Sequence, residues 1–169
     1  RQRQMCIRDR PYQTTHLLGN HDIHFMAQHW PQADHLSTAQ WKCLNLLGKG
    51  HFFWKHPQED VGAVHAGIWP SWSFGEALEL SHQLTPWVAT PEKFSQLLPY
   101  IYGNTPDTWP IIDEPLFIYL RGLLNIFTRM RTIDPITMSL DFDFTRTLSE
   151  CPTRLTPWFY LWQPPTPTT

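Results

Sequence analysis

The sequence feature that most constrains the fold is a short strand-like run that ends in a glycine and a cluster of polar groups. Residues 14–18 end in two leucines, and Gly19, Asn20, His21 and Asp22 follow at once. In α/β folds, strands deliver such groups to the carboxyl edge of a sheet, where binding sites form. We expect the glycine to permit a sharp backbone turn at this edge. An ordinary polar turn is the alternative, because Gly, Asn and Asp are frequent in turns.

The polar groups of this cluster suit metal binding and proton transfer. An asparagine oxygen is a hard ligand for divalent cations, and a histidine can bind a metal or move a proton. A second apolar strand, residues 61–64, ends in His65, and the following Ala66 and Gly67 are too small to shield the ring. A structural histidine is the alternative at this position. If the two strands are adjacent, His65 becomes a candidate co-ligand of Asn20.

Length and composition describe one globular domain. The chain has 169 residues, of which 41% are hydrophobic and 17% are charged, and its formal net charge is −2. This length supports a single core, and so small a charge creates no field that attracts nucleic acid. No apolar run approaches the ~20 residues of a membrane-spanning helix. The three cysteines are widely spaced and match neither a zinc site nor a disulfide framework. We therefore expect a cytoplasmic protein with no nucleic-acid or membrane partner.

The two ends of the sequence differ from the middle. Residues 1–12 begin with RQRQMCIRDR, which lacks the period of a helix or a strand. This segment resembles either a translated sequencing-adapter tail or a disordered terminus. Residues 161–169 are rich in Pro and Thr, and proline at this density blocks helices and central strands. We expect loose tails at both ends and one domain over residues 13–160.

Hydrophobic periodicity and cap residues predict a mixture of helices and strands. Helices are expected over residues 22–30, 37–47, 74–84, 91–102 and 116–128, and strands over 14–18, 52–54, 61–64 and 136–144. Pro31 is expected to stop the first helix, Ser37 to cap the second and Pro91 to open another. Prolines from Pro152 onward predict an extended chain. This order of elements predicts an α/β fold.

Three arginines interrupt the apolar segment over residues 121–131, namely Arg121, Arg129 and Arg131. Arginine is costly to bury unpaired, so these residues either pair with carboxylates or bind an anionic ligand. The planar guanidinium matches phosphate oxygens in a bidentate way. A structural ion pair with a nearby aspartate is the alternative for each of them.

A further candidate is the segment from Tyr102 to Trp109, in which turn residues lie between two aromatic residues. Exposed aromatic rings can stack on nucleobases. A packed surface loop explains the same residues equally well.

These motifs together resemble the calcineurin-like metallophosphoesterase superfamily. Gly19–Asp22 matches its Gly-Asn-His-Asp/Glu segment, and His65 matches its later strand-terminal histidine. Four segments in order, LLGNHDIHFMA, VHAGIWPSW, YGNTPDTW and NIFTRMR, are similar to the bacterial symmetrical diadenosine tetraphosphatases of that superfamily. The similarity extends over residues 13–159, and the FTRMR segment and the tryptophan spacings make it specific.

The resemblance implies a partial metallophosphoesterase fold, which is a β-sandwich flanked by helices. It implies hydrolysis of diadenosine tetraphosphate and related dinucleoside polyphosphates, the expected substrates, to two ADP. It also implies two divalent cations, manganese or cobalt, with magnesium as a further candidate. Together these cations would activate a hydroxide for in-line attack on phosphorus.

The resemblance also assigns roles to the candidate residues. Asn20 and His65 match two ligands of one cation. His21 matches the histidine that protonates the leaving group or stabilises the attacked phosphate. Asp22, the second expected catalytic residue, would lie behind these groups and support them without binding the metal directly. Three residues would neutralise the polyphosphate chain: Arg121, Arg129 and Arg131.

Part of the pattern of that superfamily is not found in the 169 residues. An Asp-x-His motif and a Gly-Asp-x-x-Asp-Arg motif are expected before Gly19, and a Gly-His motif after Phe159. The letters at 22–24 and 50–51 spell two of these motifs, but in the wrong order. We therefore expect a fragment that is inactive alone and has an exposed sheet edge. The alternatives are a phosphoprotein phosphatase of the same superfamily and a non-catalytic nucleotide-binding remnant.

Overall fold

The computed structural model describes residues 14–163, apart from the side chains of residues 32–34, so the predicted tail over 1–12 and most of the tail over 161–169 lie outside the described residues. The helices are α2 (Asn20–His29), α3 (Thr38–Leu47), α4 (Phe74–Val88), α5 (Pro91–Leu97), α6 (Leu116–Arg129) and α7 (Trp158–Leu161). Short 3-10 helices are η1 (Trp30–His35), η2 (Leu98–Tyr100) and η3 (Leu148–Glu150). The strands are β1 (Phe53–Lys55), β2 (Gly62–Val64), β3 (Thr132–Asp134), β4 (Ser139–Asp141) and β5 (Thr156–Pro157). This mixture confirms the α/β class. Over residues 14–163, no helix combines the length and the apolar composition that crossing a membrane requires.

Side-chain caps start the helices where the sequence predicts them. The Ser37 hydroxyl accepts the backbone N–H of Gln40 at 3.3 Å, at the start of α3. The Thr90 hydroxyl accepts the N–H of Lys93 at 3.4 Å, and Pro91 occupies the first position of α5. Such caps satisfy backbone donors that have no partner within the helix. The predicted roles of Ser37 and Pro91 are therefore confirmed.

The strands form two small sheets. β1 and β2 pair antiparallel as a hairpin, and β3 pairs antiparallel with both β4 and β5. The predicted strand over residues 14–18 is reduced to one parallel bridge beside the start of β1. In it, the N–H of Leu18 donates to the His51 carbonyl at 2.8 Å, and the N–H of His51 donates to the His16 carbonyl at 2.9 Å. The prediction of a regular strand is wrong, because the pairing stops after this bridge.

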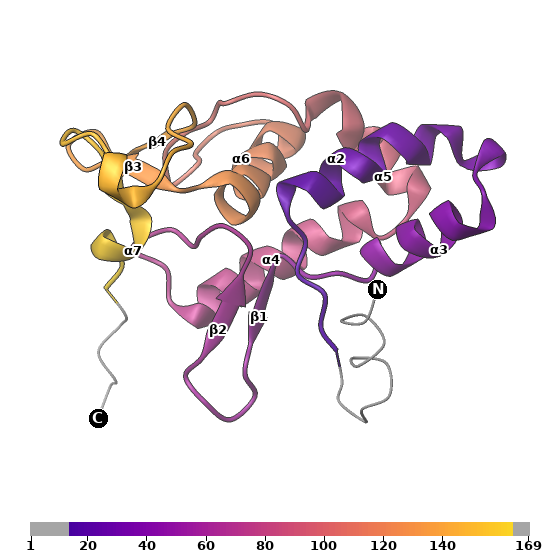
Figure 1. Ribbon diagram of the computed structural model, residues 1–169, viewed down its shortest axis with the longest axis horizontal. Coiled ribbons are helices and arrows are strands. Elements are labelled where there is room, and N and C mark those ends of the chain that lie inside the picture. The colour runs from indigo at the N-terminus through magenta and orange to yellow at the C-terminus, as the bar shows by residue number, and fades with distance from the viewer. Residues whose placement is uncertain (1–13, 164–169) are drawn as a thin grey trace.

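Helix α6 forms the centre of the core. Every residue from 122 to 128 is buried, and α6 packs against α4, which also packs against α5 and β1. The Phe127 ring centroid lies 5.6 Å from that of Trp72 and 6.2 Å from that of Phe52. In Figure 1, α2 and α6 lie on one side of α4, the hairpin β1–β2 projects on the other, and β3, β4 and α7 gather at the end away from α3. Because residues 122–128 are buried among these rings, the core holds the C-terminal half of α6 in place.

The chain after α6 forms a hairpin, whereas the sequence predicts one strand over residues 136–144. β3 ends at Asp134, whose Oδ1 accepts the N–H of Ile136 at 2.8 Å and that of Thr137 at 3.3 Å. Such a side-chain turn reverses the chain. Ile136 is consequently 91% exposed instead of lying in a strand. The residues that alternate in this segment thus form a turn and the short strand β4 in place of one longer strand.

Several predicted boundaries also differ. α2 begins at Asn20, two residues early, and ends at His29, close to the stop predicted at Pro31, although the chain continues through Pro31 as the 3-10 helix η1. α4 continues through Pro86 to Val88, which is fully buried and anchors the last turn. Leu46, expected on the apolar side of α3, is exposed. The C-terminal segment, predicted to be extended, contains β5 and α7.

The capping box at the start of α4 yields a testable prediction. Glu76 accepts hydrogen bonds from the N–H and the hydroxyl of Ser73, both at 2.8 Å, and the Ser73 oxygen accepts the N–H of Glu76 at 3.2 Å. The backbone bond and then the hydroxyl bond lower the pKa of Glu76. We expect Ser73→Ala to reduce the free energy of unfolding by about 1 kcal/mol at neutral pH, measured by urea denaturation.

The pH dependence of that effect has a defined sign. A carboxyl whose pKa is lower in the folded state stabilises the protein above its unfolded pKa, and this stabilisation is lost as the pH falls through the folded pKa. The difference between wild type and Ser73→Ala should therefore shrink in acid. Ser71→Ala, at an exposed serine two residues away, is the control. An equal loss in both variants would contradict the capping role.

Candidate functional site

An open cavity of about 720 Å³, hereafter the larger cavity, lies where α2, the loop after β2 and the end of α6 meet. Its lining includes Asn20, His65, Arg129 and Arg131. These predicted site residues come from separate segments of the sequence and share one cavity. The volume lies within the range of about 300–1,000 Å³ that small-molecule sites occupy.

Gly19 is required by the close approach of His65 and not by a turn. The φ of Gly19 is −107°, which any residue can adopt, so the expected sharp turn is wrong. A Cβ built on Gly19 would lie 2.5 Å from Cε1, 2.6 Å from Nδ1 and 2.8 Å from Nε2 of His65. The imidazole therefore lies directly against the Gly19 backbone, beside Asn20. This contact joins the two segments that the sequence singles out.

The backbone after His65 is held on both sides. The N–H of Ala66 donates to the Phe127 carbonyl near the end of α6 at 3.0 Å. The indole N–H of Trp158 donates to the Ala66 carbonyl, also at 3.0 Å. Gly67 leaves room for that indole, because a Cβ there would lie 2.8 Å from Nε1. His65 itself is exposed, so its ring is open to a ligand.

A smaller cavity of about 290 Å³ lies on the other side of Asn20. His21 is exposed and lines it. Asp22 is not among the described residues that line either cavity. Its carboxylate accepts the N–H of Gly19 at 2.8 Å and lies 3.8 Å from Nε2 of His16. A carboxylate in the first turn is favourable beside the free N–H groups of a helix, so Asp22 stabilises the start of α2.

Arg129 lines both cavities. Its guanidinium donates to the Gly103 carbonyl at 3.2 Å, and to the side-chain oxygens of Asn125 and Asn104, both at 3.0 Å. Its Cζ lies 4.5 Å from the ring centroid of Phe142. Burial lowers the pKa of Arg129. No carboxylate whose side chain the structure describes pairs with it, so the charge is available to an anion.

The other two predicted arginines have different surroundings. Arg131 is exposed, lines the larger cavity and donates to the Thr145 carbonyl at 3.2 Å. Arg121 is not among the described lining residues of either cavity. It donates to the carbonyl and the hydroxyl of Thr105 at 2.6 and 3.2 Å, and to the Tyr102 carbonyl at 3.4 Å. The structure thus places Arg121 against the loop over residues 102–105.

Some lining residues were missed by sequence reasoning: His24, Asn125, Phe142 and Arg146. Asn125 is fully buried in α6, and its amide donates to the Gly103 carbonyl at 3.0 Å. A buried amide needs partners, so an asparagine within an apolar helix is a usable signal. In the sequence, the other three residues have ordinary polar or aromatic neighbours, which give no such signal.

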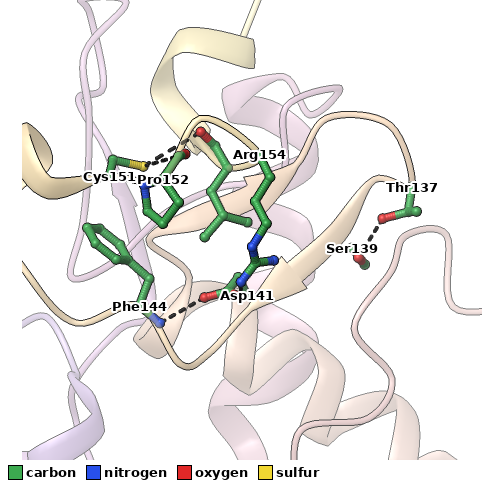
Figure 2. A network of polar contacts seen from close by, with 8 residues as sticks. Thr137, Ser139, Asp141, Phe144, Cys151, Pro152 and Arg154 are labelled. Carbon is green, nitrogen blue, oxygen red and sulfur yellow. Dashed lines mark hydrogen bonds and ion pairs between the residues drawn. The ribbon is translucent and has the colours of Figure 1, made fainter.

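The larger cavity carries an excess of positive charge. Its lining includes three arginines: Arg129 and Arg131, which pair with no described carboxylate, and Arg146, which lies 3.7 Å from Glu150. Asp141 is the only carboxylate among the described lining residues, and it accepts the N–H of Phe144 at 2.8 Å and lies 3.5 Å from Arg154 (Figure 2). Such a cavity attracts a polyanion.

The donors available to a metal are few. Asn20 and His65 offer one amide oxygen and one imidazole. Thr132 also lines the larger cavity, and its buried hydroxyl has no hydrogen-bond partner among the described residues. Among the side chains that the structure describes, no group of three or more His, Cys, Asp or Glu is arranged to hold a metal ion. The described residues therefore supply at most part of a metal site.

Comparison with known proteins gives the relationships of the chain. No known protein-family profile matches it. The chain is 31% identical over 160 residues to a protein of Glaesserella parasuis, covering 89% of this chain and 58% of that protein. It is 32% identical over 154 residues to a protein of Legionella pneumophila, covering 84% and 54%. A protein of Neisseria meningitidis is 31% identical over 166 residues, covering 92% and 58%.

All three relatives carry the name "Bis(5'-nucleosyl)-tetraphosphatase, symmetrical". The chain spans just over half the length of these curated proteins. The resemblance seen in the motifs is therefore confirmed: over most of its own length, this chain is similar to the symmetrical bis(5'-nucleosyl)-tetraphosphatases.

Proposed function

We propose that this chain is part of a hydrolase that cleaves diadenosine tetraphosphate and related dinucleoside polyphosphates into two ADP. The observation that carries the proposal is the juxtaposition of Asn20 and His65 at a cavity lined by three arginines. The names of the relatives support this substrate class. Similarity over 84–92% of the chain is consistent with one partial domain over residues 13–160, to which we assign the calcineurin-like metallophosphoesterase fold. The few, widely spaced cysteines support a cytoplasmic location.

The donors at the larger cavity fit part of a divalent-cation site. The His65 ring lies on Gly19, beside Asn20, and both side chains line the same cavity. Asn20 would supply an oxygen and His65 a nitrogen to manganese, cobalt or magnesium. A bound cation supplies charge neutralisation and a more nucleophilic water. Two protein donors are fewer than the roughly three that catalytic sites use, so we expect the 169-residue chain alone to be inactive.

His21 and Asp22 have complementary roles in this proposal. His21 is exposed at the smaller cavity, next to Asn20, where its imidazole can donate a proton to the oxygen of a departing phosphate. Asp22 accepts the Gly19 N–H and so holds the start of α2, including Gly19, against His65. Asp22 therefore acts on the position of the site and not on the substrate.

The three predicted arginines differ in whether they line a cavity. Arg129 and Arg131 line the larger cavity and would bind phosphate oxygens through their planar guanidinium groups. Arg129 is the stronger candidate, because three hydrogen bonds to neutral oxygens hold its half-buried guanidinium in place without compensating its charge, whereas Arg131 is exposed and makes one. Arg121 supports the loop over residues 102–105 and is not proposed as a phosphate ligand.

The proposal is tested in a chimera, in which residues 14–163 replace the matching segment of the Glaesserella parasuis relative. With manganese or cobalt, the chimera should convert diadenosine tetraphosphate to ADP, measured by chromatography. Asn20→Ala and His65→Ala should each lower kcat/KM by about 100-fold or more, because even outer neighbours of metal ligands are worth about 10–100-fold. Bound manganese, measured by elemental analysis, should fall in parallel.

Matched controls are available within the chain. Asn45→Ala and His82→Ala change the same residue types at exposed positions of α3 and α4, and they should leave turnover and metal content unchanged. Turnover of a phosphopeptide without cleavage of the dinucleotide would replace the proposed substrate by a phosphoprotein. Full metal content in Asn20→Ala and His65→Ala would contradict their assignment as ligands.

A further inference from the structure

The smaller cavity combines an apolar floor with a polar rim. Ile23, Ile101 and Leu124 line it and are buried, whereas Tyr102 and Asn104 line it and are exposed. Small-molecule sites typically have this composition, with a few polar groups that fix orientation. At about 290 Å³ the cavity lies at the lower limit of such sites, so it suits one ring system of a larger ligand.

Tyr102 is exposed but held in place. Its side chain is 58% exposed. Its hydroxyl lies 2.8 Å from Nδ1 of His24, whose Nε2 lies 2.9 Å from the amide nitrogen of Gln28. Its carbonyl accepts a hydrogen bond from Arg121 at 3.4 Å. A ring tethered at the backbone and at the hydroxyl loses little freedom on binding, so Tyr102 is a preorganised stacking surface.

The groups beside Tyr102 suit a nucleotide. Asn104 accepts a hydrogen bond from Arg129 through its Oδ1 at 3.0 Å. Its amide nitrogen takes part in no hydrogen bond within the described part of the chain, so it can donate to a ring nitrogen of a base. Arg129 borders the smaller and the larger cavity, together with Asn20 and Thr128. A nucleotide whose base lies in the smaller cavity would thus place its phosphates at the uncompensated guanidinium of Arg129.

We propose that the smaller cavity binds one nucleobase of the substrate, stacked on Tyr102, with the adjoining phosphates on Arg129. This inference rests on the proposed function, because it requires a substrate whose polyphosphate chain extends from Arg129 into the arginine-lined larger cavity. The two unequal cavities then hold different parts of one dinucleotide, and Asn20 lies at their shared border.

Calorimetric titration of the 169-residue chain with ADP and with pyrophosphate, in EDTA at low salt, tests the subsite. Tyr102→Ala should raise the Kd for ADP about tenfold, as loss of one stacked base does. It should leave the Kd for pyrophosphate within about twofold, because pyrophosphate has no base to stack. Arg129→Ala should weaken both ligands. Tyr102→Phe keeps the ring and should keep most of the affinity for ADP.

Tyr160→Ala is the matched control, since Tyr160 is 72% exposed and lies outside both cavities. Tryptophan emission spectra that match the wild type establish that each variant is folded. The subsite is overturned if wild type binds ADP no more tightly than pyrophosphate, if Tyr102→Ala weakens both ligands equally, or if Tyr102→Phe loses as much affinity for ADP as Tyr102→Ala. Failure of the chimera to cleave the dinucleotide, with these titrations as expected, would overturn the proposed function and not the base subsite.

Discussion

Replacing Phe127 by alanine is expected to lower the free energy of unfolding by about 3–5 kcal/mol, the typical cost of removing a buried aromatic ring. The Phe127 side chain is fully buried in α6, with its ring centroid 5.6 Å from that of Trp72 and 6.2 Å from that of Phe52. Alanine would leave a cavity at the centre of the core that these large rings cannot fill. Urea denaturation followed by tryptophan fluorescence measures the loss.

The same substitution should disturb the candidate site. The Phe127 carbonyl accepts the Ala66 N–H at 3.0 Å and so positions the backbone after His65. Arg129 follows two residues later on the same helix. We therefore expect Phe127→Ala to reduce metal content and turnover of the chimera in addition to its stability. Ile136→Ala is the control, because Ile136 is 91% exposed and its truncation should cost less than about 0.5 kcal/mol. Equal midpoints for the two variants would contradict the central place of α6.

The features predictable from the sequence are those that depend on neighbours along the chain. Ser37 and Pro91 mark helix starts through local hydrogen bonding and fixed backbone geometry, and both roles are confirmed. The long apolar run predicts a helix over residues 116–128, and α6 covers Leu116–Arg129. That Asn20 and His65 share a cavity was also predicted, because each residue follows a strand-like run, although the regular strand over residues 14–18 does not form.

The features that sequence reasoning missed depend on contacts between distant segments. The need for glycine at position 19 comes from the His65 ring, which no local pattern around Gly19 reveals. Arg121 lies in the same apolar segment as Arg129, yet its partners are in the loop over residues 102–105. The hairpin of β3 and β4 follows from hydrogen bonds to Asp134, whereas the apolar alternation alone favours one longer strand.

Gly19→Ala is expected to separate function from stability. The new Cβ would lie 2.5–2.8 Å from three atoms of the His65 ring, so the ring must move. Because His65 is exposed, its ring can turn into solvent, and the cost in stability should stay below the roughly 1–3 kcal/mol of an overpacked core. The displaced imidazole no longer lies beside Asn20. In the chimera, kcat/KM should therefore fall about 100-fold or more, as for His65→Ala.

Gly75→Ala is the matched control for this effect. Gly75 lies in α4, and the nearest atom to a Cβ built there is the Ser73 hydroxyl oxygen at 3.7 Å, an ordinary contact. Alanine should stabilise the helix by about 0.5–1 kcal/mol and leave turnover unchanged. Two results would contradict the argument: full activity in Gly19→Ala, or a loss of activity that merely follows a loss of folded protein. Reduced metal content in folded Gly19→Ala would instead support the argument that Gly19 allows His65 its position, because the substitution adds one methyl group and removes no ligand.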